Sequence, residues 1–350
     1  MDRRSFLKTT TAAAAASTAA VGAAQARQVV SAPAVVPART ELRVAASSRF
    51  VEAARRLMRD ITIASVGGIV INVVEEAVMA DDIASGHCDA VFGHLPEIYR
   101  APELSLFSGL PGLLAVSPEH HLAWHEVAGG DLFLEEVTAP RGLMALVAGH
   151  SGAGTGIWAT SEIDGLRAFA EADISSQGLG RLITNRISDA FDRPQNGAAR
   201  PSLVELPLSP LEAFGELPSN ARQVWYRDGL HAQGFSTTLI LSRNIWDSLN
   251  AGDQLLIATL ARAAAHMDVS HARVRDRLEV PAIMNSLALR RAPLPADIIQ
   301  AIQHTAVDVV HAELSQKREI ARAFEAYGAF YQAMIGTPLP GLPGQGDPSV

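Results

Sequence analysis

The chain has 350 residues, of which 48% are apolar, and its formal net charge is −8. An acidic balance without any Lys/Arg-rich block argues against nucleic acid or anionic lipid as the main partner. Cys88 is the only cysteine, so no intrachain disulfide can form and stability must come from the core.

The first residues predict an export signal. Arg3-Arg4 precede Ser5-Phe6-Leu7-Lys8, and an Ala-rich run then ends at the small-x-small sequence Ala24-Gln25-Ala26. A charged start, a short apolar run and such a site are typical of a secretory signal, and the paired arginines indicate the twin-arginine route. We therefore predict that residues 1–26 are a signal peptide, that 27–40 form a linker, and that the mature protein is periplasmic. An uncleaved membrane anchor is the alternative, which the short, weakly hydrophobic run disfavours.

The next fifty residues alternate strand and helix patterns. Strands are predicted at 41–46, 68–74 and 88–92, with helices at 50–61 and 79–84 between them. The order β-α-β-α-β implies a parallel, doubly wound sheet. Cys88 falls in the third strand, where we expect inert packing.

Helices dominate the rest of the chain, separated by a few strands and one Gly-rich stretch. The predicted elements are a helix at 120–137 broken at Gly129-Gly130, a strand at 141–148, the Gly-rich stretch 149–156, a strand at 236–241, a long helix from Asn250 to about Leu278, and helices at 295–314 and 318–335. The residues after these helices are rich in Pro and Gly, which is typical of a disordered tail.

Several collinear segments carry a family resemblance. They are 123–130, Leu143, 149–152, 156–158, 226–231, 237–239, 244–249, 291–295 and 298–302, together with Asp89-Ala90 after Gly86. Together they resemble the periplasmic solute-binding proteins of TRAP transporters, and most closely the branch that takes 2-oxo acids and related carboxylates. The resemblance covers most of residues 41–336 and rests on the order of the segments, because none of them is a sharp motif.

The resemblance implies an α/β, periplasmic-binding-protein-like fold. It has two α/β lobes joined by hinge strands, with long C-terminal helices that cross both lobes. The implied divisions are lobe I at 41–148 plus 236–280, lobe II at 149–235 plus 281–315, a C-terminal helix at 316–336 and a disordered tail at 337–350. Some relatives dimerise through the C-terminal helix, so a homodimer is expected there.

The implied function is capture of a small organic, carboxylate-containing ligand between the lobes and its delivery to a membrane permease, without catalysis. No cofactor is expected, although a cation that bridges ligand and protein is known in this branch. From the resemblance and the positions of the crossings, we expect nine residues to line the site: Ser48, Arg49, His94, Thr155, Trp158, Ser175, Arg181, Trp225 and His231. The arginines would meet an anionic group, the tryptophans would form walls, and the others would supply hydrogen bonds.

The chain departs from the family at the carboxylate site. Ser175 stands where the family has an arginine that forks onto the ligand carboxylate. Gly154 stands where the branch often has glutamine, and the segment between Glu205 and Trp225 is shorter than in the family. Either the ligand is different, or another arginine (Arg49, Arg181 or Arg222) has taken over, or binding has been lost.

Two other functions compete with the receptor interpretation. The stretch Gly149-His150-Ser151-Gly152-Ala153 resembles the nucleophile turn of an esterase-like α/β-hydrolase, although Ala153 replaces a glycine of that motif. Ser151 would be the nucleophile, with Asp228 and His231 as its partners. The other alternative is a degenerate relative that acts as a sensor or structural partner.

Two clusters on helices have both functional and structural interpretations. His121 and His125 are spaced so that both could hold a transition metal, but a solvated helix face is the favoured interpretation. Phe324, Tyr327 and Tyr331 form one stripe, which we expect to be core or dimer contact.

Overall fold

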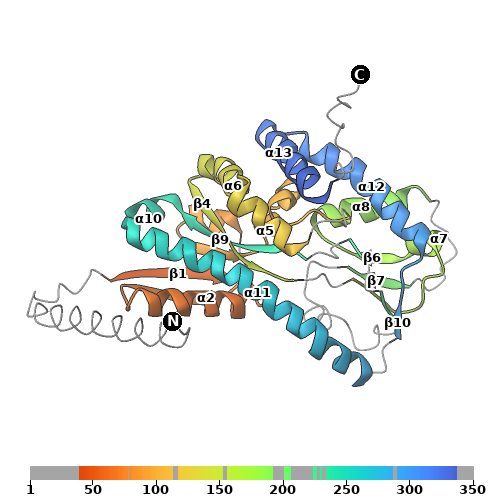
Figure 1. Cartoon of the computed structure of the whole chain (residues 1–350), viewed down its shortest axis with the longest axis horizontal. Helices are drawn as coiled ribbons and strands as arrows, with labels where there is room; N and C mark the ends of the chain where they lie inside the picture. The colour runs from red at the N-terminus through yellow and green to blue at the C-terminus, as the bar shows by residue number, and fades with distance from the viewer. Residues whose placement is uncertain are drawn as a thin grey trace, which may run out of the picture. The chain divides into compact units, whose positions relative to one another are not determined.

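The computed structural model describes residues 39–336, except 78, 113–116, 153–155, 192–200, 206–223, 227–228, 231–233 and 287–289. The predicted signal peptide, nearly all of the linker and the predicted disordered tail therefore lie outside the described residues. Within residues 41–336 the strands form two five-stranded sheets, each with its own helices (Figure 1). In the described part of the chain, no helix is both long enough and apolar enough to cross a bilayer.

The first sheet is mixed. Its strands lie in the order β2 (Ile69–Glu75), β1 (Thr40–Ala46), β3 (Ala90–Gly93), β9 (Ser236–Ser242) and β4 (Leu143–His150). β1 and β3 are parallel, but β9 is antiparallel to both β3 and β4. The parallel arrangement predicted for the first strands is therefore confirmed for β1 and β3, whereas β9, which joins the sheet later in the chain, runs antiparallel. The reason is that the chain leaves the sheet after His150 and re-enters it at Ser236, which is the register partner of His150.

Helices cover both faces of this sheet, so its strands read as nearly continuous apolar runs. Val44 and Ala46 point into one core and Ala45 into the other, as strand alternation requires. The first core lies under α2 (Val51–Ala64), α10 (Arg243–Ser248) and α11 (Ala251–Ser286). The second lies under α3 (Ala80–Ala84), α4 (Leu95–Tyr99), η1 (Pro102–Phe107), α5 (Pro118–Val127), α6 (Gly130–Thr138) and α13 (Arg318–Ile335), with η2 (Ala139–Arg141) leading into β4.

The second sheet has short strands and a helix layer on one face. Its order is β10 (Arg290–Ala292), β8 (Val224–Tyr226), β5 (Ile157–Ala159), β7 (Ser202–Val204) and β6 (Asp173–Ser175). Ile157, Ala159 and Tyr226 pack in one core with α7 (Leu166–Glu171), α8 (Gly178–Asp189) and α12 (Ala296–Leu314). The alternate residues of β5 and β8, Trp158 and Trp225, therefore belong to the opposite face.

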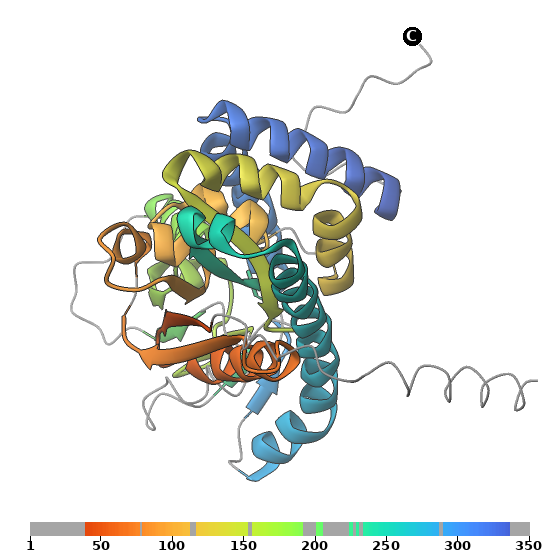
Figure 2. The ribbon, with the colours of Figure 1, turned by 90° about the vertical axis from the view of Figure 1, so that its left-hand side faces the viewer.

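The longest helix, α11, extends further than the sequence interpretation, which ended it near Leu278. It continues to Ser286 with Pro281 in its last turns. Figures 1 and 2 show α11 running beside α2 and continuing beyond it toward the start of β10. In the sequence, α11 lies between β9 of the first sheet and β10 of the second, so it carries the chain from one sheet to the other.

The aromatic stripe of α13 is core. Phe324, Tyr327 and Tyr331 are all at most 5% exposed. The ring of Tyr327 meets Trp124 edge to face, with 4.9 Å between the ring centroids. These side chains are thus occupied within the chain, and a homodimer through this helix stays a prediction that would need other residues.

Candidate functional site

A single register row crosses the second sheet on the face away from its helices. Arg291 of β10 pairs with Trp225 of β8, which pairs with Trp158 of β5. Trp158 in turn pairs with Val204 of β7, and Val204 pairs with Ser175 of β6. Directly paired residues point to the same face of a sheet. Three residues expected from the sequence therefore lie in one row, with an arginine at one end and Ser175 at the other.

The two tryptophans of this row form a stacked aromatic wall. Their rings are stacked with centroids 5.7 Å apart and planes at 23°. The guanidinium of Arg291 lies over the ring of Trp225, 5.4 Å from its centroid. Neither tryptophan belongs to a hydrophobic core cluster of the described residues, although Trp158 is 3% and Trp225 6% exposed. The row combines two aromatic surfaces with a cation, which suits a small planar anion.

Ser175 stands at the other end of the row. Its side chain is exposed, and its backbone carbonyl accepts a hydrogen bond from the Glu205 N–H. The neighbouring Ser176 hydroxyl donates to a carboxylate oxygen of Glu205 at 3.1 Å, and both side chains are buried. Arg181, one of the candidate replacements, is exposed on α8.

A second group of expected residues gathers after β1 and β3 of the first sheet. Arg49 donates to both carboxylate oxygens of Glu97, at 3.2 and 3.4 Å. Nδ1 of His94 lies 3.2 Å from the same carboxylate, and its ring meets Phe235 edge to face at 5.0 Å. The charge of Arg49 is therefore already matched by Glu97. Ser48 lies next to this group and is exposed.

The two chain segments that cross between the sheets are tied to each other. Ser151 and Phe235 exchange hydrogen bonds: the N–H of Ser151 donates to the Phe235 carbonyl at 2.9 Å, and the Ser151 hydroxyl oxygen accepts from the N–H of Phe235 at 3.0 Å. Arg275 of α11 donates to the Ser151 carbonyl at 3.0 Å. The segments thus form one braced junction beside α11.

This arrangement gives Ser151 a structural role. A hydrolase nucleophile turn requires a helix directly after the serine, whereas the next described element after Ser151 is strand β5. The Ser151 hydroxyl is also engaged by the backbone of the returning segment. Its suggested partners Asp228 and His231 lie outside the described residues. The geometry gives no support to the hydrolase alternative.

The histidine pair of α5 faces the core, so the favoured interpretation of a solvated helix face is wrong. His121 and His125 are 4% and 2% exposed. Nε2 of each lies near the carbonyl oxygen of Phe107, at 3.2 and 3.0 Å, and Nδ1 of His125 lies 3.1 Å from Asp131. Among the described residues no three potential ligands converge on a common metal position. The short helix shows little sequence periodicity, which is why its inward face was missed.

His150, at the end of β4, is buried and neutral. Its Nδ1 accepts the backbone N–H of Gly152 at 2.9 Å. Burial lowers the pKa of His150 to about 3; the carboxylate of Glu119 acts in the opposite direction, and His125 lowers the pKa further. Burial also holds the pKa of His121 well below its ordinary value, and the neighbouring histidines act in the same direction.

Some of the residues that the sequence analysis singled out are not described by the structure. Thr155 and His231 lie outside the described residues, as do Gly154 and Arg222. Arg291 was missed as a site residue, although its segment was part of the family resemblance. The only signal was its position opposite Trp225, which requires the pairing of β10 with β8.

Solved structures of solute-binding proteins share the fold of this chain. A TRAP transporter solute-binding protein from Bordetella bronchiseptica, with calcium and picolinate in one of its sites, has a TM-score of 0.73 over 85% of this chain and 93% of its own, at 14% identity. The fold is that of these receptors.

Two further structures of such proteins agree. That from Pseudoalteromonas atlantica, with sodium and pyruvate, has a TM-score of 0.72 at 15% identity, covering 85% of this chain and 95% of its own. That from Colwellia psychrerythraea, with calcium and pyruvate, scores 0.70 at 14% identity, covering 85% and 96%. No protein-family model and no curated protein matches the sequence. The two-lobed fold expected from the sequence is thereby confirmed.

Proposed function

We propose that the chain is the periplasmic solute receptor of a TRAP-type transporter. It would capture a small carboxylate-containing ligand reversibly, without catalysis, and deliver it to membrane permease subunits. The observation that carries the proposal is the row of Arg291, Trp225 and Trp158 on the face of the second sheet away from its helices. The fold neighbours with bound picolinate and pyruvate support the same class of ligand.

Arg291 takes the part that the family resemblance assigns to an arginine at position 175. A guanidinium presents two parallel N–H donors to a carboxylate, and that of Arg291 lies over the Trp225 ring. A planar ligand body bound to it would contact the edges of the stacked indole rings. The wall is assembled before the ligand arrives, which lowers the entropy lost on binding.

The other expected residues complete the proposed site from both halves of the chain. Ser175 lies at the far end of the row, and Ser48 and His94 come from the first sheet. Thr155, His231 and the two arginines Arg49 and Arg181 remain part of the proposal. A cation bridging ligand and protein is an alternative to direct contact, because neighbours hold calcium or sodium together with their ligands.

The two halves would close on the ligand by bending at the braced junction. We propose lobe I at 41–148 plus 236–280 and lobe II at 149–235 plus 281–315, joined by the segments that flank Ser151 and Phe235. Hinge closure of this kind buries a ligand between two rigid bodies. Export through the twin-arginine signal at 1–26 would deliver the folded receptor to the periplasm.

Replacing Arg291 tests the proposed site. Arg291→Gln is expected to weaken pyruvate or picolinate binding by about 10- to 100-fold, because a charge-assisted hydrogen bond contributes about 1.5–3 kcal/mol. Isothermal titration of the purified full chain, with and without calcium or sodium, measures the effect.

Arg290 provides the matched control. It is the adjacent residue on β10, and its guanidinium is paired with Glu162. Arg290→Gln is expected to leave the affinity within about twofold of the wild type, since exposed ion pairs contribute little. Equal affinity losses in both variants would reject Arg291 as the ligand's partner. A wild-type chain that binds none of a broad set of carboxylates would favour the degenerate relative instead.

A further inference from the structure

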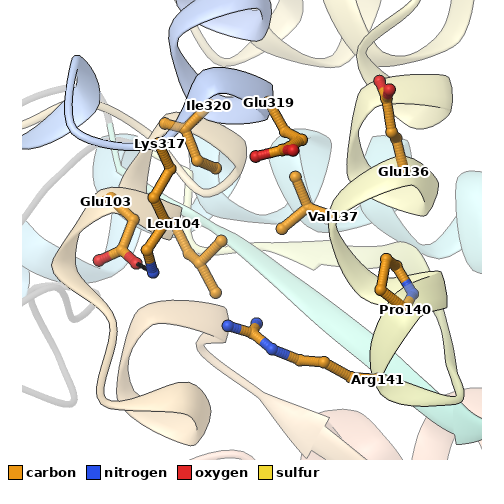
Figure 3. A pocket seen from close by; sticks show the side chains of 9 residues that line it. All are labelled: Glu103, Leu104, Glu136, Val137, Pro140, Arg141, Lys317, Glu319 and Ile320. Atoms are coloured by element: carbon orange, nitrogen blue, oxygen red, sulfur yellow. Dashed lines mark hydrogen bonds and ion pairs between the residues drawn. The ribbon is translucent and has the colours of Figure 1, made fainter.

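A separate pocket lies among the helices that cover the first sheet. Its cavity volume is about 290 Å³, at the lower end of the range for small-molecule sites. The lining comes from η1, α6, η2 and α13 and the residue preceding α13: Glu103, Leu104, Glu136, Val137, Pro140, Arg141, Lys317, Glu319 and Ile320 (Figure 3). None of these residues belongs to the second sheet or its helices, so the pocket is distinct from the Arg291 row.

Most charges around this pocket neutralise each other. Lys317 donates to Glu103. Glu136 is held by Arg322 through two parallel hydrogen bonds of 3.0 and 2.9 Å. Among the described residues, Arg141 and Glu319 form no ion pair. The guanidinium of Arg141 and the carboxylate of Glu319 are thus available to bind a ligand.

Arg141 is positioned to receive an anion. Its guanidinium lies over the ring of Tyr99, 4.8 Å from the centroid, which orients it without cancelling its charge. Figure 3 shows this guanidinium pointing into the pocket, with the carboxylate of Glu319 directed toward the same space. Leu104, Val137 and Ile320 supply the apolar part of the lining.

We propose that this pocket binds a small zwitterion with an aliphatic body, such as an α-amino acid of the size of leucine. Its carboxylate would accept hydrogen bonds from Arg141, its ammonium group would donate to Glu319, and its aliphatic chain would contact the apolar wall. A dicarboxylate would place its second charge near Glu319, and a simple amine would leave Arg141 without a partner. The opposite signs of the two open charges therefore select a zwitterion.

Binding of L-leucine to the purified full chain tests this inference by isothermal titration. We expect saturable binding with a dissociation constant of about 1 mM or tighter, as for a small ligand with two charged contacts. Arg141→Gln and Glu319→Gln are each expected to weaken it at least about tenfold. Both side chains are exposed, so neither change leaves a buried charge.

Control variants distinguish leucine binding in this pocket from a general effect of net charge and from binding at the Arg291 site. Arg186→Gln and Glu325→Gln each remove one exposed charge outside the pocket and should leave leucine binding unchanged. Arg291→Gln should also leave it unchanged. The inference is overturned if leucine fails to bind the wild type, or if its affinity responds to Arg291 and not to Arg141. Equal binding of pentanoate and leucine would overturn the role of Glu319.

Discussion

Gly234→Ala is expected to destabilise the chain by about 4 kcal/mol or more, or to prevent its folding. Gly234 has a φ of +77°, a region that costs other residues roughly 1–2 kcal/mol. An added Cβ would also lie 1.6 Å from the carbonyl oxygen of Gly152 and 2.6 Å from the hydroxyl oxygen of Ser151. The carbonyl oxygen of Gly152 belongs to the backbone of the other crossing segment. The steric clash can therefore be relieved only if the two segments of the braced junction move apart.

Gly86→Ala is the matched control for this prediction. Gly86 has a nearly identical φ of +75°, but an added Cβ would meet nothing within 4 Å. Only the backbone cost of roughly 1–2 kcal/mol is then expected. Urea unfolding of both variants, followed by circular dichroism, measures the difference. If the two variants lost the same stability, the close approach of the crossing segments would be refuted.

Acidification is expected to remove about 2 kcal/mol of stability by pH 5 through His150 alone. Its pKa is about 3 in the folded chain and 6.5 when unperturbed. Below pH 6.5 the imidazole of His150 therefore binds a proton in the unfolded state but not in the folded state. The stability from this group is complete above about pH 6.5 and falls as the pH falls toward 3, where the loss approaches about 5 kcal/mol. The lowered pKa of His121 adds a loss of the same sign.

His150→Asn separates this effect from general acid denaturation. The asparagine oxygen can accept the Gly152 N–H in place of Nδ1, but it does not titrate in this range. The free energy of unfolding, measured in urea between pH 7.5 and 5, should fall less steeply in this variant by about 2 kcal/mol. Identical pH profiles for variant and wild type would show that His150 is not held neutral in the folded chain.

Local patterns were enough to find most elements. The strands and helices from β1 to β3 and the helices α12 and α13 lie within a few residues of the sequence prediction. Each of these elements buries one or both of its faces, and this burial gives its apolar residues a regular spacing that can be recognised in the sequence. The direction of β9 could not be found in this way. It depends on where the chain re-enters the sheet after forming a second one, and this is a long-range property.

In the candidate site, too, local sequence patterns predicted some residues, whereas others depend on long-range pairing. Trp158 and Trp225 were expected from their place near the crossings, and the structure stacks them. Arg291 was missed because its neighbour Trp225 is distant in sequence and is brought close only by the pairing of β10 with β8. The burial of His121 and His125 likewise depends on η1 and α13, which pack over them from other parts of the chain.

The proposed receptor function requires that the two halves of the chain close around a small carboxylate. Spin labels on cysteines introduced at Asp60 of α2 and Arg186 of α8, both exposed, report the distance between the halves. The native Cys88 is 4% exposed, and burial, aided by the nearby acidic residues Asp82 and Glu76, raises its pKa to about 11, so it should not be labelled.

Pulsed electron resonance on this doubly labelled full chain, with and without saturating pyruvate or picolinate and calcium, is the most direct test. We expect the distance distribution to shift to a shorter, narrower peak when the ligand is added. The same shift should be absent in the Arg291→Gln variant at the same ligand concentration. A distribution that stays unchanged with every carboxylate would contradict the proposed receptor function.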